Sequence, residues 1–321
     1  MIGYFLKRIL QSIVVVLVVS VVVFVILYHA GDPVRLLLPP DATQQQMEEL
    51  RHHLGLDQPF AVQYWRFLQN ALRGDLGTSF AFNQPAIGLI LERVPATLEL
   101  AVTAMALSVL MGIPAGMYAA IRPQSWGAKL ILSASLLGIS LPVFWLGIIL
   151  ILVFSVSLGW LPSSGRGETV LFAGVRSGLF TLDGLRHLLM PAFTIAVFQL
   201  ALNVRLVRAG MLEVMLQDFV KFLKAKGLSE RRIVFVHALK NILIPVVTVL
   251  GLQLGNLIAF AVVTESIFAW PGMGKLVIDS IHALDRPVVL AYLLVVAVLF
   301  VCLNFVVDLL YTFLDPRIRL R

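Results

Sequence analysis

Near its beginning the chain carries an uncharged, apolar run, ILQSIVVVLVVSVVVFVILY, at residues 9–28. At a rise of about 1.5 Å per residue, a helix of this length crosses a hydrocarbon core about 30 Å thick. Valine favours strands in water, but a lone strand in lipid would leave its backbone N–H and C=O groups without hydrogen bonds. The run therefore predicts a membrane-spanning helix.

The composition of the whole chain agrees with this assignment. Of the 321 residues, 59% are hydrophobic and only 13% are charged, too few to cover the surface of a soluble domain. Five further runs are long and apolar enough to span a membrane, at residues 96–121, 130–158, 188–207, 242–264 and 288–314. The sequence therefore predicts an all-α integral membrane protein with six transmembrane helices.

The distribution of basic residues predicts the orientation. With the N-terminus inside, the inner segments hold 15 of the 25 Lys and Arg residues, eight of them between Arg205 and Lys240. Because basic loops stay on the inner side, both termini are expected there. Lys7 and Arg8 precede the first run as in a signal peptide, but that run is too long for one and no small-x-small cleavage site stands out. The net charge of +7 is thus assigned to inner loops, and nucleic-acid binding is the weaker interpretation.

The outer segment at residues 30–95 predicts a small helical cap. Residues 43–53 and 59–72 carry apolar side chains at helical spacing, for example Met47 and Leu50, then Phe60 and Tyr64. A Gly-Asp-Leu-Gly turn follows at 74–77. The cap either shields the helix ends or docks an outside partner, and both possibilities remain open.

No catalytic motif accompanies these helices. The sequence has no His-Glu-x-x-His and no Gly-x-Ser-x-Gly, and the Gly-Lys pair at 274–275 lacks the other residues of a phosphate loop. The single cysteine, Cys302, excludes an intrachain disulfide and a multi-cysteine metal site. Glu99, Glu265 and Asp308 lie near span ends, where solvated or hydrogen-bonded carboxylates are expected rather than a proton relay. An intramembrane enzyme and an ion-coupled secondary transporter are therefore the weaker alternatives.

The most informative segment is the largest inner loop, residues 208–241. Its first part is amphipathic, with apolar side chains at helical spacing and lysines between them. Gly227 is expected to end this helix and Ser229 to cap the next, so that two short helices meet at a right angle. The candidate functional residues are Lys221, Lys224, Ala225, Lys226, Gly227, Leu228, Ser229 and His237. The pattern alone leaves open whether anionic lipid or a partner protein holds this elbow.

The same residues resemble the cytoplasmic signature loop of ATP-binding-cassette (ABC) importer permeases. The match consists of Ala225-Lys-Gly227, followed after ten residues by His237-Ala-Leu, Asn241 and Pro245. Segments along the chain are similar to the first (B-type) subunit of the peptide-permease family, at 31–33, 74–79, 93–99, 162–165, 265–272, 308–311 and 315–317. The chain departs from the family at Phe222-Leu223, where a small polar residue and alanine are usual, and its segment 159–187 looks shorter.

The resemblance implies a type I ABC importer permease with an N-terminal anchor helix at 1–29, a periplasmic helical cap at 30–95, and a core permease domain at 96–321 that includes the coupling loop 208–241. It implies a non-catalytic subunit of the bacterial cytoplasmic (inner) membrane, forming half of the pathway for di- or oligopeptides or a related solute. The implied partners are a homologous second permease subunit, two ATPase subunits that bind ATP and Mg²⁺, a periplasmic solute-binding protein and membrane lipid. The chain itself is expected to bind no cofactor and no nucleic acid. The candidate residues of the elbow would couple the chain to the ATPase, and no residue identifies the solute.

Overall fold

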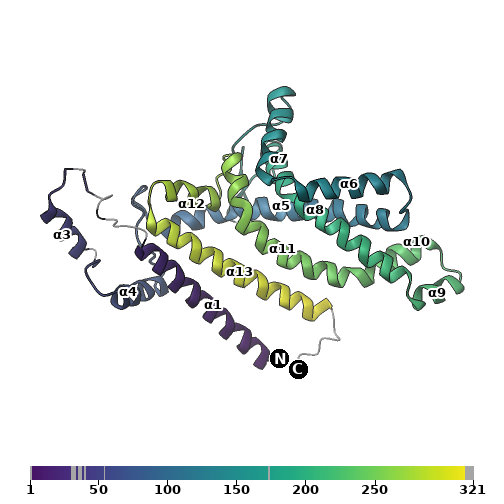
Figure 1. Cartoon of the computed structure of the whole chain (residues 1–321), viewed down its shortest axis with the longest axis horizontal. Helices are drawn as coiled ribbons and strands as arrows, with labels where there is room; N and C mark the ends of the chain where they lie inside the picture. The colour runs from purple at the N-terminus through teal and green to yellow at the C-terminus, as the bar shows by residue number, and fades with distance from the viewer. Residues whose placement is uncertain are drawn as a thin grey trace. The chain divides into compact units, whose positions relative to one another are not determined.

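A computed structural model describes residues 2–29, 34, 38–39, 41–53, 55–172 and 174–314 (Figure 1). These residues are mostly helical. The chain divides into two compact units, Met1–Pro95 with Gly272–Val301, and Ala96–Pro271 with Cys302–Arg321. The family-like motifs at 31–33 and 315–317 lie outside the described residues.

Helices occupy the positions of all six expected spans. Four are long and apolar enough to cross a membrane: α5 (Ala86–Ile121), α8 (Leu182–Met215), α11 (Leu239–Ile267) and α13 (Arg286–Leu314). The first, α1 (Ile2–His29), contributes a shorter apolar helix, Leu10–Ile26. α8 extends beyond the expected residues 188–207 because backbone hydrogen bonding continues into polar residues that a hydrophobic run does not count.

The expected span at 130–158 is divided into two helices at Pro142. α6 (Trp126–Ser140) meets the helix made of α7 (Val143–Leu150) and the π-helix η1 (Ile151–Ser157) at 110°. Leu141 between them is extended, with φ −81° and ψ 131°. The ring of Pro142 disfavours a helical conformation at the residue before it, and this accounts for the break. Counting the bent pair as one span, five helices of the described chain meet the length and composition of a span.

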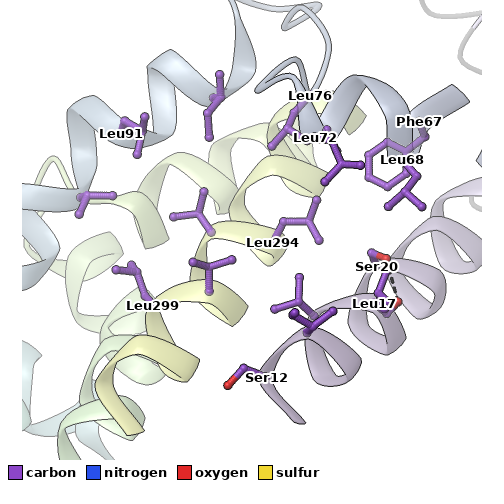
Figure 2. Close-up of a pocket in the computed structure, with 17 residues that line it drawn as sticks. Ser12, Leu17, Ser20, Phe67, Leu68, Leu72, Leu76, Leu91, Leu294 and Leu299 are labelled. Carbon is purple, nitrogen blue, oxygen red and sulfur yellow. Dashed lines mark hydrogen bonds between the residues drawn. The ribbon is translucent and has the colours of Figure 1, made fainter. Parts of the chain in front are cut away.

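In the first unit, the two expected cap helices are present and one of them packs on α1. α3 (Gln44–His53) and α4 (Phe60–Leu72) match the predicted segments closely. Phe24 of α1 lies 5.3–5.5 Å, between ring centroids, from three aromatic rings of α4: Phe60, Tyr64 and Phe67. A groove of about 630 Å³ with almost wholly apolar walls lies between α1, α4, α5 and α13 (Figure 2).

The first unit also explains the family-like motif at 74–79. Gly74 and Gly77 take φ values of +81° and +90°, which turn the chain between α4 and α5. The motif ends at Ser79, whose hydroxyl donates to the carboxylate of Asp285, a wholly buried residue just before α13. The same carboxylate accepts the backbone N–H groups of Phe80 and Ala81 at 3.1 and 3.2 Å. The motif therefore anchors the end of the cap to the residue that begins the last long helix.

In the second unit, α5 and α8 approach each other closely. A Cβ atom on Gly116 of α5 would lie 2.7 Å from the carbonyl oxygen of Val204 and 2.8 Å from Cβ of Val207, both on α8. Gly112 and Gly116, two small residues four positions apart, thus serve packing within the chain. A hairpin that was not expected, β1 (Val170–Phe172) with β2 (Val175–Ser177), precedes α8, and its register pairs Leu171 with Arg176.

Candidate functional site

The predicted elbow lies between α8 and α11, but its parts differ from the expectation of two short helices. α8 ends at Met215, and a separate short helix, α9 (Asp218–Ala225), follows after one break. After Gly227, the single turn α10 (Glu230–Arg232) continues through the π-helix η2 (Ile233–Ala238) directly into α11. The second arm of the elbow is therefore the beginning of a membrane-spanning helix.

Gly227 closes α9 by a Schellman motif. Its φ is +76°, and its N–H donates to the carbonyl of Lys224 at 2.9 Å. The N–H of Leu228 donates to the carbonyl of Leu223 at 3.3 Å, which supplies the second bond of this motif. No described atom lies within 4 Å of the position that a Cβ on Gly227 would occupy. The turn therefore requires glycine for its backbone conformation, and it leaves open space outside.

The candidate residues form one exposed surface at this turn. Five of them are exposed on α9 or directly after it: Lys221, Lys224, Ala225, Lys226 and Gly227. A sixth, Leu228, is half-buried. Ser229 caps the next turn through its backbone only, because its side chain makes no capping hydrogen bond. His237 lies apart on η2, half-buried, and its carbonyl accepts a hydrogen bond from Asn241 Nδ2 at 2.8 Å.

The charges of this surface are mostly available to a partner. Lys221 pairs with Asp218 at 2.8 Å, but both side chains are exposed and such pairs add little stability. The ammonium of Lys226 lies 4.6 Å from the ring centroid of Phe222. Phe222, the residue at which the chain departs from the family, is 58% exposed, so its ring adds an apolar contact to a basic surface.

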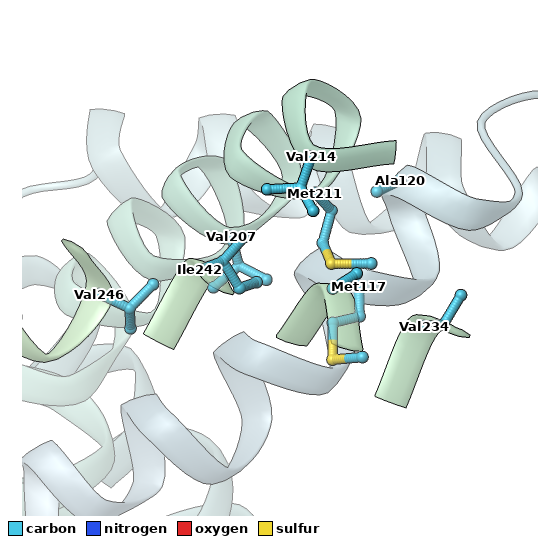
Figure 3. Close-up of a cluster of buried hydrophobic side chains, with 9 residues drawn as sticks. Met117, Ala120, Val207, Met211, Val214, Val234, Ile242 and Val246 are labelled. Carbon is cyan, nitrogen blue, oxygen red and sulfur yellow. The ribbon is translucent and has the colours of Figure 1, made fainter. Parts of the chain in front are cut away.

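Beneath the elbow lies a cluster of buried apolar side chains from α5, α8, η2 and α11 (Figure 3). Its buried members are Met117, Ala120, Val207, Met211, Val214, Val234, Ala238, Ile242 and Val246. Phe219 of α9 packs against this cluster, and the neighbouring Val220 is also buried. The cluster therefore joins α9 to the ends of three long helices, α5, α8 and α11.

A second arrangement, which the sequence did not predict, lies at the other end of α8. Glu99 of α5 is 7% exposed, and its carboxylate receives two N–H groups of Arg166, one of them from Nε at 3.0 Å. It also accepts the backbone N–H of Gly178 at 2.8 Å, directly after the hairpin. Arg166 donates further to the carbonyl of Arg176 at 2.7 Å. Glu99 is thus hydrogen-bonded as expected, but it is buried rather than solvated.

We call Glu99, Arg166 and the residues bonded to them the Glu99 clamp. The segment after α11 also contacts this clamp. The wholly buried Trp270 donates its indole N–H to the carbonyl of Ala96 at 2.9 Å, and its ring lies 5.8 Å from the guanidinium of Arg166. Glu265, also wholly buried, accepts the hydroxyl of Thr97 at 2.7 Å. Three family-like segments, 93–99, 162–165 and 265–272, therefore meet at or beside one buried network.

One continuous helix, α8, connects the two arrangements. α8 begins at its N-cap Thr181, three residues after Gly178, and ends beside α9. Its 34 residues span about 51 Å at 1.5 Å per residue. Across the described residues, no group of three or more His, Cys, Asp or Glu side chains is placed to hold a metal ion. α8 therefore has an exposed elbow at one end and a buried clamp at the other.

Comparison with a solved structure identifies the fold. The fold matches a chain of the MetNI methionine ABC transporter, solved in an inward-facing conformation, with a TM-score of 0.55 and 16% identity over 71% of this chain and 96% of that one. Together with the helices and the elbow, this match shows that the chain has the fold of a type I ABC importer permease. Sequence comparison identifies the family. The chain belongs to the binding-protein-dependent transport system inner membrane components, whose family model matches residues 112–320, and the N-terminal model of the same family matches residues 1–101.

Individual relatives identify the branch of this family. The chain is 44% identical to the di/tripeptide transport system permease protein DppB of Pseudomonas aeruginosa over 90% of both chains. It is 37% identical to the dipeptide transport system permease protein DppB of Alkalihalophilus pseudofirmus over 99% of this chain and 100% of that one. It is 39% identical to the glutathione transport system permease protein GsiC of Escherichia coli over 99% of both. These matches confirm the predicted resemblance to B-type peptide permeases, which are not themselves ATPases.

Proposed function

We propose that this chain forms half of the pathway by which a bacterial importer carries dipeptides, oligopeptides or a related solute across the cytoplasmic membrane. Relatives named for di- and tripeptides and for glutathione support a small peptide-like cargo. The excess of Lys and Arg in the elbow segment supports an orientation with both termini in the cytoplasm. The hairpin, the Glu99 clamp and the cap then lie on the periplasmic side.

The proposed partners are a homologous second permease, two ATPase subunits that hold ATP and Mg²⁺, and a periplasmic solute-binding protein. The observation that supports the coupling role is the turn at Gly227, which ends α9. The Schellman turn presents exposed lysines with an open space where any other residue would carry a Cβ atom. A partner surface can therefore approach the backbone directly at this point.

The mechanism follows from packing. Closure of the ATPase dimer would move α9, and Phe219 would transfer the displacement to the apolar cluster beneath it. α8 and α11 both contribute to that cluster, so their elbow ends would move together. This movement would open the pathway to one side of the membrane and then to the other. This chain supplies no catalytic group to the cycle, and ATP hydrolysis takes place on the partner subunits.

The experiment is uptake by proteoliposomes that contain the complete transporter and a saturating, dipeptide-loaded binding protein. Uptake should require ATP on the elbow side, stop with vanadate, and continue when a protonophore removes the proton gradient. Uptake without ATP that follows an imposed proton or sodium gradient would instead support the alternative, an ion-coupled secondary transporter. Unlabelled glutathione added as a competitor would then separate the two kinds of cargo that the relatives suggest.

A further inference from the structure

A cleft between α6 and α8 is not used by the proposed mechanism. Its volume is about 620 Å³, and its lining combines two arginines with apolar side chains: Leu132, Leu136, Arg205, Leu206, Arg208 and Ala209. The residues from α6 and α8 all belong to the second unit. A cleft of this size is large enough to hold part of an organic ligand.

The two arginines lie on one face of α8 and have no anionic partner in the described chain. Their spacing of three residues places them side by side. Arg208 Nε is buried and makes no hydrogen bond within the described residues, and neither guanidinium has a carboxylate within ion-pair distance there. A buried donor without an acceptor is costly, so the site calls for an anion that the chain itself does not provide.

The position of the arginines identifies the surroundings of that anion. Arg208 lies seven residues before the end of α8, about 10 Å along its axis, where the apolar span gives way to the elbow. Because the expected apolar span ends at residue 207, Arg208 is expected at the depth at which lipid headgroups meet the hydrocarbon core. Leu136, which is 64% exposed, continues the wall of the cleft along α6 into the apolar part of the span.

We infer that this cleft binds an anionic phospholipid of the leaflet on the elbow side. The two guanidinium groups would hold the phosphate through paired N–H donors, and one acyl chain would lie against the leucines. Basic pockets between transmembrane helices bind anionic headgroups in this way. Free phosphate matches the arginines but not the leucine wall, and this distinction favours the lipid.

The test uses the complete importer in nanodiscs of phosphatidylcholine with phosphatidylglycerol, released into detergent and weighed by native mass spectrometry. The wild-type complex should retain phosphatidylglycerol in preference to phosphatidylcholine. Arg205→Gln with Arg208→Gln should lower that preference about tenfold, the effect expected when charge-assisted hydrogen bonds are lost. Arg122→Gln, at the exposed end of α5 outside the cleft, is the matched control and should change nothing.

A second variant tests the cleft while keeping both charges. Ala209 is exposed on the cleft wall, so Ala209→Trp fills the space without disturbing the core and should also displace the lipid. Retention of phosphatidylglycerol by both cleft variants at the wild-type level would overturn the proposal. Displacement of phosphatidylglycerol from the wild-type complex by added inorganic phosphate would also overturn it. So would loss of a partner subunit from the arginine variant with unchanged lipid retention, because the arginines would then bind a different anion.

Discussion

The proposal for the elbow depends most on Gly227, and the substitution Gly227→Val tests it directly. At φ +76° the backbone is in the left-handed region, where an L-residue costs about 1–2 kcal/mol and a β-branched one is especially poor. No described atom lies within 4 Å of the position of the new Cβ atom, so this conformational cost is the main effect expected on the isolated subunit. It corresponds to a reduction of about 5–30-fold in the population of the closed turn. A docked partner would add a steric penalty, because the side chain would enter the space it occupies.

The assay purifies the complex through a tag on this chain, then measures the retained ATPase subunits and the ATP-driven uptake. Gly227→Val should keep the second permease, because the spans do not depend on this turn, while retention of the ATPase or the link between hydrolysis and uptake should fall about tenfold or more. Gly74→Val is the matched control. Gly74 has φ +81° and equally open surroundings, so it pays the same backbone cost in the cap. Gly227→Asn, a residue that tolerates this conformation, should be milder than valine.

Normal coupled transport by Gly227→Val, with the second permease and ATPase retained, would refute the docking role of the turn. An elbow held only by lipid predicts the reverse pattern. In that case Gly227→Val would be mild, whereas replacing Lys221, Lys224 and Lys226 together by Gln would release the elbow and abolish transport. Measuring both variants in the same vesicles separates the two possibilities.

Four further outcomes are expected. In a Cys302→Ser background, Lys224→Cys should resist an impermeant thiol reagent added outside intact cells, and labelling there would reverse the proposed orientation. Gly116→Val should lower thermal stability by about 1–3 kcal/mol, the usual cost of overpacking, because its side chain would meet the α8 backbone, whereas Gly88→Val, with nothing within 4 Å, should cost less. Glu99→Gln should make the hairpin sensitive to protease, since it leaves a buried arginine without its ion pair, and wild-type resistance would exclude the clamp. Charge reversals on the exposed face of α3 should weaken stimulation of ATP hydrolysis by the loaded binding protein without loss of assembly, and unchanged stimulation would make the cap only a lid.

Much of the fold could be predicted because it depends on local chemistry. Runs of apolar residues located all six helical segments, and helical spacing located α3 and α4. The sharp bend at Leu141 could not be predicted from Pro142 alone, because proline is tolerated inside membrane helices such as α8 and α11. Which prolines bend a span depends on whether neighbouring helices satisfy the freed carbonyl group, and that information is not local.

The turn at Gly227 and the Glu99 clamp also differ in how far they depend on local sequence. The turn at Gly227 is a short-range motif, so its conformation followed from one glycine after an amphipathic helix. The Glu99 clamp joins residues 67 to 174 positions apart, through Arg166 and Trp270. Only the clustering of family-like segments hinted at it, and no spacing rule could have paired a carboxylate in one segment with an arginine in another.

The elbow and the Glu99 clamp are held with different strengths, and this difference decides which end of α8 moves. Removing one partner of a buried ion pair costs about 3–5 kcal/mol, and Glu99 with Arg166 is such a pair, with side chains only 4% and 13% exposed. The elbow is held by two backbone hydrogen bonds, a left-handed glycine and part of an apolar cluster, and replacing that glycine costs about 1–2 kcal/mol. A load applied to α9 therefore moves the elbow end of α8 before it opens the clamp. The elbow end would move while the clamp end holds the base of the hairpin in place, so α8 would tilt about its N-terminal end. Variants at the elbow should thus uncouple a well-folded transporter, whereas variants at the clamp should first lose structure around the hairpin.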